Sequence, residues 1–301
     1  MTSSASAQDP KQYSTPHKTR SVGISNAVFY LCLSVIGGTY VLLIVAMLAA
    51  DSWYMIEKSA RTATASSTPW KAILFENPIA EALTDHKIRY SIWLSMISCT
   101  LSAVFSLLVA VPIGYLLARH EFRGKRFLDA ILDIPIVLPP LVVGLSLLIL
   151  FQYPPFAWIA RDVVYQLPAV VLAQFSVACA FAVRTMKSTF DHINPRCEQV
   201  AITLGCSKVQ AFGWVVLPEA SRGMMTAFTL AWARSLGEFG PLLIFAGATR
   251  MKTEVLSTSV FLELNVGNIE AAVAVSLIMV LAAVTVLVLT RQFGVRDVTL
   301  S

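Results

Sequence analysis

The sequence predicts an all-α integral membrane protein with six transmembrane helices. Of its 301 residues, 56% are hydrophobic and only 14% are charged, whereas a soluble domain has about 45–50% apolar and about 25% charged residues. Several apolar runs also reach the roughly 20 residues that a helix needs to cross the hydrocarbon core of a bilayer. The basic residues lie between these runs and form no single patch, which argues against a nucleic-acid-binding protein.

Six segments fit that length, in order 27–50, 91–118, 127–151, 167–187, 224–248 and 270–290. The first is longer than the roughly 7 to 15 apolar residues of a signal peptide, and a long polar tail precedes it. We therefore expect residues 27–50 to form an uncleaved first helix.

The distribution of lysine and arginine predicts the orientation, because cytoplasmic segments carry an excess of both. The short outer loop near residues 152–166 contains only Arg161, whereas the loop RHEFRGKRF at 119–127 is strongly basic. We expect that loop and both termini to be cytoplasmic. The basic residues on that side would be Lys11, Lys18, Arg20, Arg119, Arg123, Lys125, Arg126, Arg184, Lys187, Arg196, Lys208, Arg222, Arg291 and Arg296.

The predicted domain organisation follows from these segments. Residues 1–25, rich in Ser, Thr and Gln, are expected to be a disordered cytoplasmic tail. Residues 26–90 would contain the first helix and an extracytoplasmic segment, residues 91–292 the main transmembrane domain, and residues 293–301 a cytoplasmic C-terminal tail.

The stretch CEQVAITLGCSKVQAFGWVVLP, residues 197–218, interrupts the apolar segments with helical periodicity. Asn194 is a suitable N-cap with Pro195 as the first helical residue, Gly205 is suited to a left-handed helix end, and Ser207 can cap a second helix. Pro218 would stop that helix. The first helix would carry one apolar face, formed by Cys197, Val200, Ala201 and Leu204. This face could lie under the bilayer surface or present the helix to a partner.

The same stretch resembles the EAA loop of permease subunits of type-1 ABC importers, which have a MetI-like transmembrane domain. The residues that carry the resemblance are Glu198, Ala201, Gly205, Leu217 and Pro218; the usual Glu-Ala-Ala is Glu-Gln-Val-Ala here. In that family this loop is the coupling helix, which docks on a cytoplasmic ATP-hydrolysing subunit. The resemblance therefore implies ATPase partners and places ATPase coupling on these five residues.

Three further stretches within residues 90–292 are similar to the molybdate, tungstate and sulfate permease group. They are GYLLARHEFRGKRFLDAILDIPIVLPPLVVGLSLLILF, WARSLGEFGPLLIFAG and ATRMKTEVLSTSVFLELNVGNIEAAVAVSLIMV. The resemblance implies a homodimer in the inner membrane that takes an oxyanion, molybdate or tungstate first and sulfate or thiosulfate second, from an extracytoplasmic binding protein.

The sequence carries no motif for covalent chemistry. The phosphate-binding pattern GxxxxGK[ST] is absent, because Arg126 follows Gly124-Lys125 and Arg119 stands where the first glycine belongs. No Ser/His/Asp or HExxH arrangement is present either. We expect a protein that is not an enzyme, uses no cofactor or metal, and takes its energy from a partner.

Two charged residues fall inside the predicted fifth span. Arg234 and Glu238 are four residues apart and share a helix face, so they can form an ion pair that eases membrane insertion. Alternatively, they line the translocation pathway or brace a gate, where Arg234 offers positive charge to an anion. Gly240 and Pro241 favour a bend beside them, which suits a gate or tight packing.

The third span contains three prolines in six residues, Pro135, Pro139 and Pro140. Proline removes a backbone donor, and irregular backbone at membrane depth needs protein or water around it. We expect these prolines to face the bundle interior near the pathway, with a simple kink as the alternative. A stand-alone secondary transporter is a less favoured reading of the chain, because such proteins often contain repeats with paired broken helices and no repeat is visible.

Overall fold

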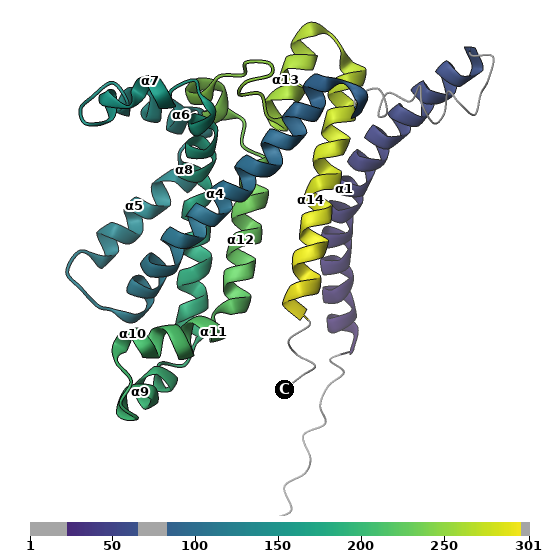
Figure 1. Cartoon of the computed structure of the whole chain (residues 1–301). Coiled ribbons are helices and arrows are strands. Elements are labelled where there is room, and N and C mark those ends of the chain that lie inside the picture. Colours follow the sequence, from purple (N-terminus) through teal and green to yellow (C-terminus); the bar gives the residue numbers. More distant parts are fainter. Residues whose placement is uncertain (1–22, 66–82, 296–301) are drawn as a thin grey trace, which may run out of the picture. The chain divides into compact units, whose positions relative to one another are not determined.

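The computed structural model describes residues 23–65 and 83–295, and every regular element within these ranges is a helix (Figure 1). The chain forms two compact units, Met1–Asp51 and Ser52–Ser301. The predicted all-α fold is therefore confirmed for the described residues.

The first predicted span lies within α1 (Gly23–Ala65), in which Phe29–Glu57 is a 29-residue apolar stretch long enough to cross a membrane. The span is thus longer than the predicted 27–50. Because α1 starts at Gly23, the last three residues of the predicted tail are helical. Residues 1–22, 66–82 and 296–301 lie outside the described residues.

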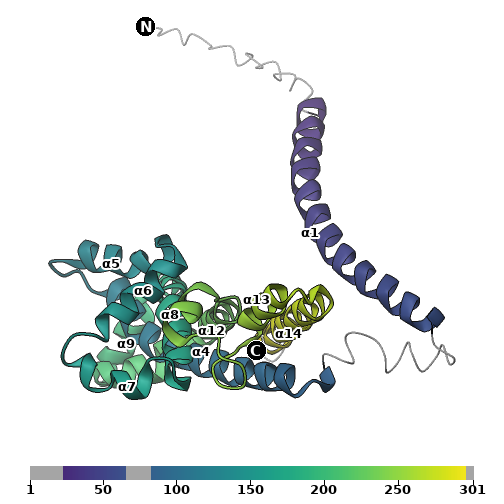
Figure 2. The same ribbon diagram turned by 90° about the horizontal axis from the view of Figure 1, so that it is seen from above.

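The second unit is organised around three helices that pack side by side, α4 (His86–Arg119), α8 (Leu167–His192) and α12 (Ser221–Leu236) (Figures 1 and 2). Small side chains make the close approach of these helices possible, as is usual in membrane bundles. On α4 the buried small residues form a stripe along one face: Ser91, Ser95, Ser98, Cys99, Ser102, Ala103, Ser106, Ala110 and Gly114.

The third predicted span, residues 127–151, is not one straight helix. It consists of α5 (Lys125–Val137) and α6 (Pro140–Leu150), which are bent by 112° relative to each other. Pro139 and Pro140 lack a backbone N–H, so the helical hydrogen bonds cannot continue through them. The last bond of α5 runs from the Leu138 N–H to the Ile134 carbonyl.

The fifth predicted span, 224–248, is broken where Gly240 and Pro241 predict a bend. α12 ends at Leu236, and a short π-helical segment, η3 (Leu242–Ala246), follows after a break. Pro241 begins the next helical segment without needing a backbone donor. Within the described residues, four helices qualify as membrane spans by length and composition, or five with the α5–α6 pair.

The remaining elements lie at the two ends of the bundle. The loop between α8 and α12 contains α9 (Pro195–Thr203), α10 (Lys208–Ala211), η2 (Phe212–Val216) and α11 (Leu217–Glu219), which lie at the lower end in Figure 1. At the opposite end, η1 (Phe156–Trp158) and α7 (Ala160–Val163) follow α6, and α13 (Leu256–Val266) precedes α14 (Ile269–Val295). The last helix contains the sixth predicted span.

Candidate functional site

The loop between α8 and α12 begins with the predicted capped helix. The Asn194 side chain accepts a hydrogen bond of 3.0 Å from the Arg196 N–H, and Pro195 is the first residue of α9. Gly205 has a φ of +99°, the left-handed conformation that glycine adopts most easily. Ser207 then caps α10 through reciprocal bonds with Gln210. These local predictions are confirmed.

The prediction that Pro218 stops the second helix is wrong. Leu217, Pro218 and Glu219 form α11, which continues directly from the π-helical segment η2. Within η2 the Leu217 N–H bonds to the Phe212 carbonyl, a wider turn than in an α-helix. Because the hydrogen-bond register shifts there, Pro218 falls in a first helical turn, where its missing donor costs little.

Glu198 points toward the end of α4. Its Oε1 accepts a 2.5 Å hydrogen bond from the Tyr115 hydroxyl, and its Oε2 lies 3.9 Å from Arg119 Nε. The side chains of Arg119 and Glu198 are only 10% and 15% exposed. Arg119 also donates a 2.8 Å bond to the Ile193 carbonyl, just before α9. The first half of the loop is therefore attached to α4.

An aromatic cluster surrounds this attachment. The Tyr115 ring makes edge contacts with Phe190 of α8 at 5.6 Å and with Phe212 of η2 at 4.7 Å, between ring centroids. Such pairs are favourable beyond the area that they bury. Sequence reasoning missed Tyr115 and counted Arg119 only as an inner-side charge, because neither is close to Glu198 in the sequence.

Four large apolar side chains of the loop are exposed. Leu204 is 81% exposed and Val209 80%, and Val200 and Trp214 are also exposed; we call these four residues the loop patch. Of the predicted apolar face of α9, only Ala201 is buried within the chain. Several large apolar side chains exposed on one short loop make it a candidate interaction surface.

Arg234 and Glu238 form the predicted pair, with Arg234 Nη1 2.5 Å from Glu238 Oε1. Glu238 is buried, with 1% of its side chain exposed, whereas 29% of the Arg234 side chain is exposed. The Arg234 guanidinium also lies 5.4 Å from the centre of the Phe181 ring on α8. The Arg234 guanidinium is thus paired with Glu238 and Phe181, while part of its side chain stays exposed.

The breaks in the third and fifth spans meet. A Cβ added to Gly240 would lie 2.8 Å from the Leu141 nitrogen and 3.1 Å from the Pro140 carbonyl carbon. A Cβ on Gly144 would lie 2.7 Å from the Pro241 Cα. The structure therefore brings Gly240 and Pro140 together. In the single chain Pro139 and Pro140 are exposed and Pro135 is partly buried. Their position near the pathway stays a prediction.

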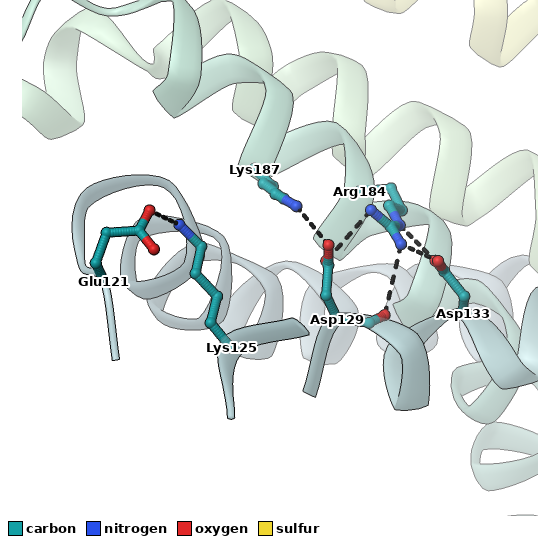
Figure 3. A network of polar contacts seen from close by, with 6 residues as sticks. All are labelled: Glu121, Lys125, Asp129, Asp133, Arg184 and Lys187. Atoms are coloured by element: carbon teal, nitrogen blue, oxygen red, sulfur yellow. Dashed lines mark hydrogen bonds and ion pairs between the residues drawn. The ribbon is translucent and has the colours of Figure 1, made fainter. Parts of the chain in front are cut away.

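A second polar network links α5 to α8 (Figure 3). Arg184 forms an ion pair and hydrogen bonds with Asp133 and lies 3.3 Å from Asp129, which also pairs with Lys187 at 2.8 Å. Figure 3 also shows Lys125 bound to Glu121 at 2.6 Å in the preceding loop. The sequence contains a signal for this network that was not used. Asp129 and Asp133 lie at the start of the third predicted span, and Arg184 and Lys187 lie at the end of the fourth, on the same predicted side of the membrane.

These features define a polytopic helical membrane protein. Two of its spans are broken and contact each other at their breaks, and an exposed loop is bound to α4 through the Glu198 carboxylate. In the parts of the chain that the structure describes, no group of three or more His, Cys, Asp or Glu side chains could hold a metal ion. The chain belongs to the family of binding-protein-dependent transport system inner membrane components, which matches residues 110–296.

Named relatives agree with this assignment. The chain is 32% identical over 227 residues to the sulfate transport system permease protein CysT of Escherichia coli, covering 72% of this chain and 82% of that protein. It is 37% identical over 152 residues to the molybdate/tungstate transport system permease protein WtpB of Pyrococcus abyssi, covering 50% of this chain and 58% of the relative.

A solved structure shares the fold. A bacterial alginate ABC transporter, crystallised in complex with an alginate pentasaccharide-bound periplasmic protein, aligns with a TM-score of 0.61 at 14% sequence identity. The alignment covers 89% of this chain and 98% of the transporter chain.

Proposed function

We propose that this chain is the permease subunit of an ATP-driven importer that carries a tetrahedral oxyanion, namely molybdate, tungstate or sulfate, across the cytoplasmic membrane. The observation that carries the proposal is the similarity to CysT over 227 residues, together with a loop whose carboxylate is held by α4 and whose apolar patch is open. The similarity to WtpB supports molybdate and tungstate equally.

Energy comes from separate cytoplasmic ATPase subunits that dock on the loop patch. Ala201 is the buried residue of α9, Gly205 sets the turn, and Leu217 and Pro218 return the chain to α12. When two ATPase subunits close on ATP, they draw the loops of two permease copies together and switch the pathway from inward-facing to outward-facing. The two permease copies form a homodimer in this scheme. The loop and both termini lie in the cytoplasm, as the lysine and arginine distribution favours.

The anion is delivered by an extracytoplasmic binding protein, in the way that the related alginate transporter works with a periplasmic protein. It then passes the breaks in the third and fifth spans. Arg234 supplies positive charge there, Glu238 fixes the guanidinium, and the Gly240–Pro140 contact forms the gate. Pro135 and Pro139, which precede Pro140 in the same broken span, contribute to it.

Reconstitution of the chain in liposomes, with its ATPase and with binding proteins for each anion, tests the proposal. We expect ATP-dependent uptake of radiolabelled sulfate or molybdate, with the second anion and tungstate acting as competitors. The matched control is the same permease with an ATPase subunit whose catalytic glutamate is replaced by glutamine.

Uptake that persists without any ATPase would favour the stand-alone secondary transporter. A transporter that hydrolyses ATP and imports none of the three anions would contradict the assigned substrate class while leaving the permease assignment in place.

A further inference from the structure

We infer that Tyr115 and Arg119 are positioning residues that transmit the movement of the ATPase-docking loop to the helix breaks through α4. This inference rests on the proposed function. The alternative is that a movement of α9 reaches α12 only along the polypeptide chain, through α10, η2 and α11.

The first step is the attachment of the loop to α4. Tyr115 and Arg119 both contact Glu198 in the middle of α9, and Arg119 also binds the Ile193 carbonyl before the helix. Phe212, beyond the Gly205 turn, packs on the Tyr115 ring. Since the last turn of α4 contacts the loop before, within and after α9, a displacement of α9 must carry that turn with it.

The second step is the attachment of α4 to the pathway helices. A Cβ on Gly114, next to Tyr115, would lie 2.8 Å from the Met186 Cβ on α8. Further along α4, Ser102 shares a buried 3.0 Å hydrogen bond with Ser235 of α12, and Trp232 donates a 3.3 Å bond to Thr100. Ser235 adjoins Arg234 and precedes the Gly237 break, so the route ends at the candidate gate.

The contacts of Tyr115 and Arg119 with Glu198, which we call the anchor, have the chemistry needed to transmit a movement of the loop to α4. A charge-assisted hydrogen bond in a partly buried site is stronger than a neutral one and has a defined geometry. The carboxylate is engaged with α4 and the loop patch faces outward, so the partner's force reaches the bundle through Glu198. Coupling between distant sites travels through contiguous packed networks of this kind when both sites bias them.

The test uses the complete transporter in liposomes with two single variants, Tyr115→Phe and Glu198→Gln, and their double variant. Tyr115→Phe keeps the ring contacts and removes only the hydroxyl. For Tyr115→Phe we expect assembly with the ATPase and basal ATP hydrolysis to be retained, while the amount of anion imported per ATP falls about 10- to 100-fold, the effect of losing one hydrogen bond to a charged group. The loss in the double variant should be smaller than the two single losses combined, because both changes weaken the same Tyr115–Glu198 contact.

The matched control is Tyr90→Phe, which removes a comparable 3.0 Å bond, to the Lys252 carbonyl, at the other end of α4. It should keep the ratio of import to hydrolysis. Arg119→Lys retains the positive charge and should preserve more coupling than Arg119→Gln. An unchanged ratio in Tyr115→Phe, or a parallel loss of assembly, hydrolysis and import, would overturn the inference.

A second measurement does not depend on import. Spin labels at position 108 of α4, introduced as Leu108→Cys in a background with the native cysteines replaced by serine, report the ATP-driven change in distance between the two copies. The change should be smaller with Tyr115→Phe than with the wild-type tyrosine. An equal change would count against the anchor even if the transported substrate were a different one.

Discussion

Gly144 of α6 lies against Pro241 so closely that a Cβ on the glycine would be 2.7 Å from the Pro241 Cα. The contact joins the two broken spans by backbone alone. We predict that Gly144→Ala destabilises the folded protein by about 1–3 kcal/mol, the usual cost of overpacking. The thermal unfolding midpoint in detergent measures this. Gly237→Ala, whose Cβ would meet only ordinary contacts at 3.8 Å, should leave the midpoint nearly unchanged, and equal shifts would refute the close approach.

Gly205 is predicted to be required for its backbone conformation and not for space. Its φ is +99° and no atom lies within 4 Å of an added Cβ, so Gly205→Ala costs only the strain of a left-handed residue, about 1–2 kcal/mol. We expect reduced ATP-dependent uptake with normal membrane insertion. Gly205→Asn should retain more uptake, because asparagine tolerates this conformation. Equal activity of the two variants would show that conformation is not the cause.

The loop patch gives a third prediction. Leu204 is largely exposed, so Leu204→Asn should leave the unfolding midpoint unchanged but weaken binding of the ATPase by about 1–3 kcal/mol, the value of one buried leucine. Co-purification and titration with the ATPase subunit measure the loss. Leu264→Asn changes an exposed leucine of α13 at the opposite end and serves as the control. If both variants bind the ATPase equally well, the patch is not the docking surface.

Arg234 and Glu238 can be separated into a structural and a transport role. Arg234→Gln leaves Glu238 buried without its partner, which is expected to cost about 3–5 kcal/mol. The double variant Arg234→Gln/Glu238→Gln removes both charges and should recover most of the stability. If Arg234 also serves the anion, the double variant should be stable yet still import slowly. If the double variant is stable and imports the anion at the normal rate, the ion pair serves only the insertion of the helix into the membrane.

The network of Arg184, Asp129, Asp133 and Lys187 is predicted to stabilise the α5–α8 packing in a salt-dependent way. Its side chains are partly exposed, so each pair contributes about 1 kcal/mol or less. Arg184→Asp should lower the unfolding midpoint, and the swap Arg184→Asp/Asp133→Arg should restore part of it. The difference in unfolding midpoint between these two variants should become smaller in high salt, where exposed charges are screened. A difference that does not depend on salt would argue against an electrostatic role.

The local features of this protein were predictable from the sequence. The membrane class, the order of the apolar segments, the Asn194 and Ser207 caps, the Gly205 turn and the Arg234–Glu238 pair all depend on residues within a few positions of one another. Helical periodicity, capping and side-chain pairing four residues apart act over that distance. The error at Pro218 arose because a π-helical turn cannot be distinguished from a regular helix by apolar composition, whereas Gly240 and Pro241 did predict a bend in the 224–248 span.

The contacts that give those residues a role were decided by the tertiary structure. Tyr115 and Glu198 are 83 positions apart, and Gly240 meets Pro140 only because two helices break at the same place. Sequence pattern predicted which side of α9 is apolar, but packing of α4, α8 and η2 determined that Glu198 faces inward while Leu204 is exposed. Such contacts depend on how separate helices approach one another, and helical periodicity along one segment carries no information about that approach.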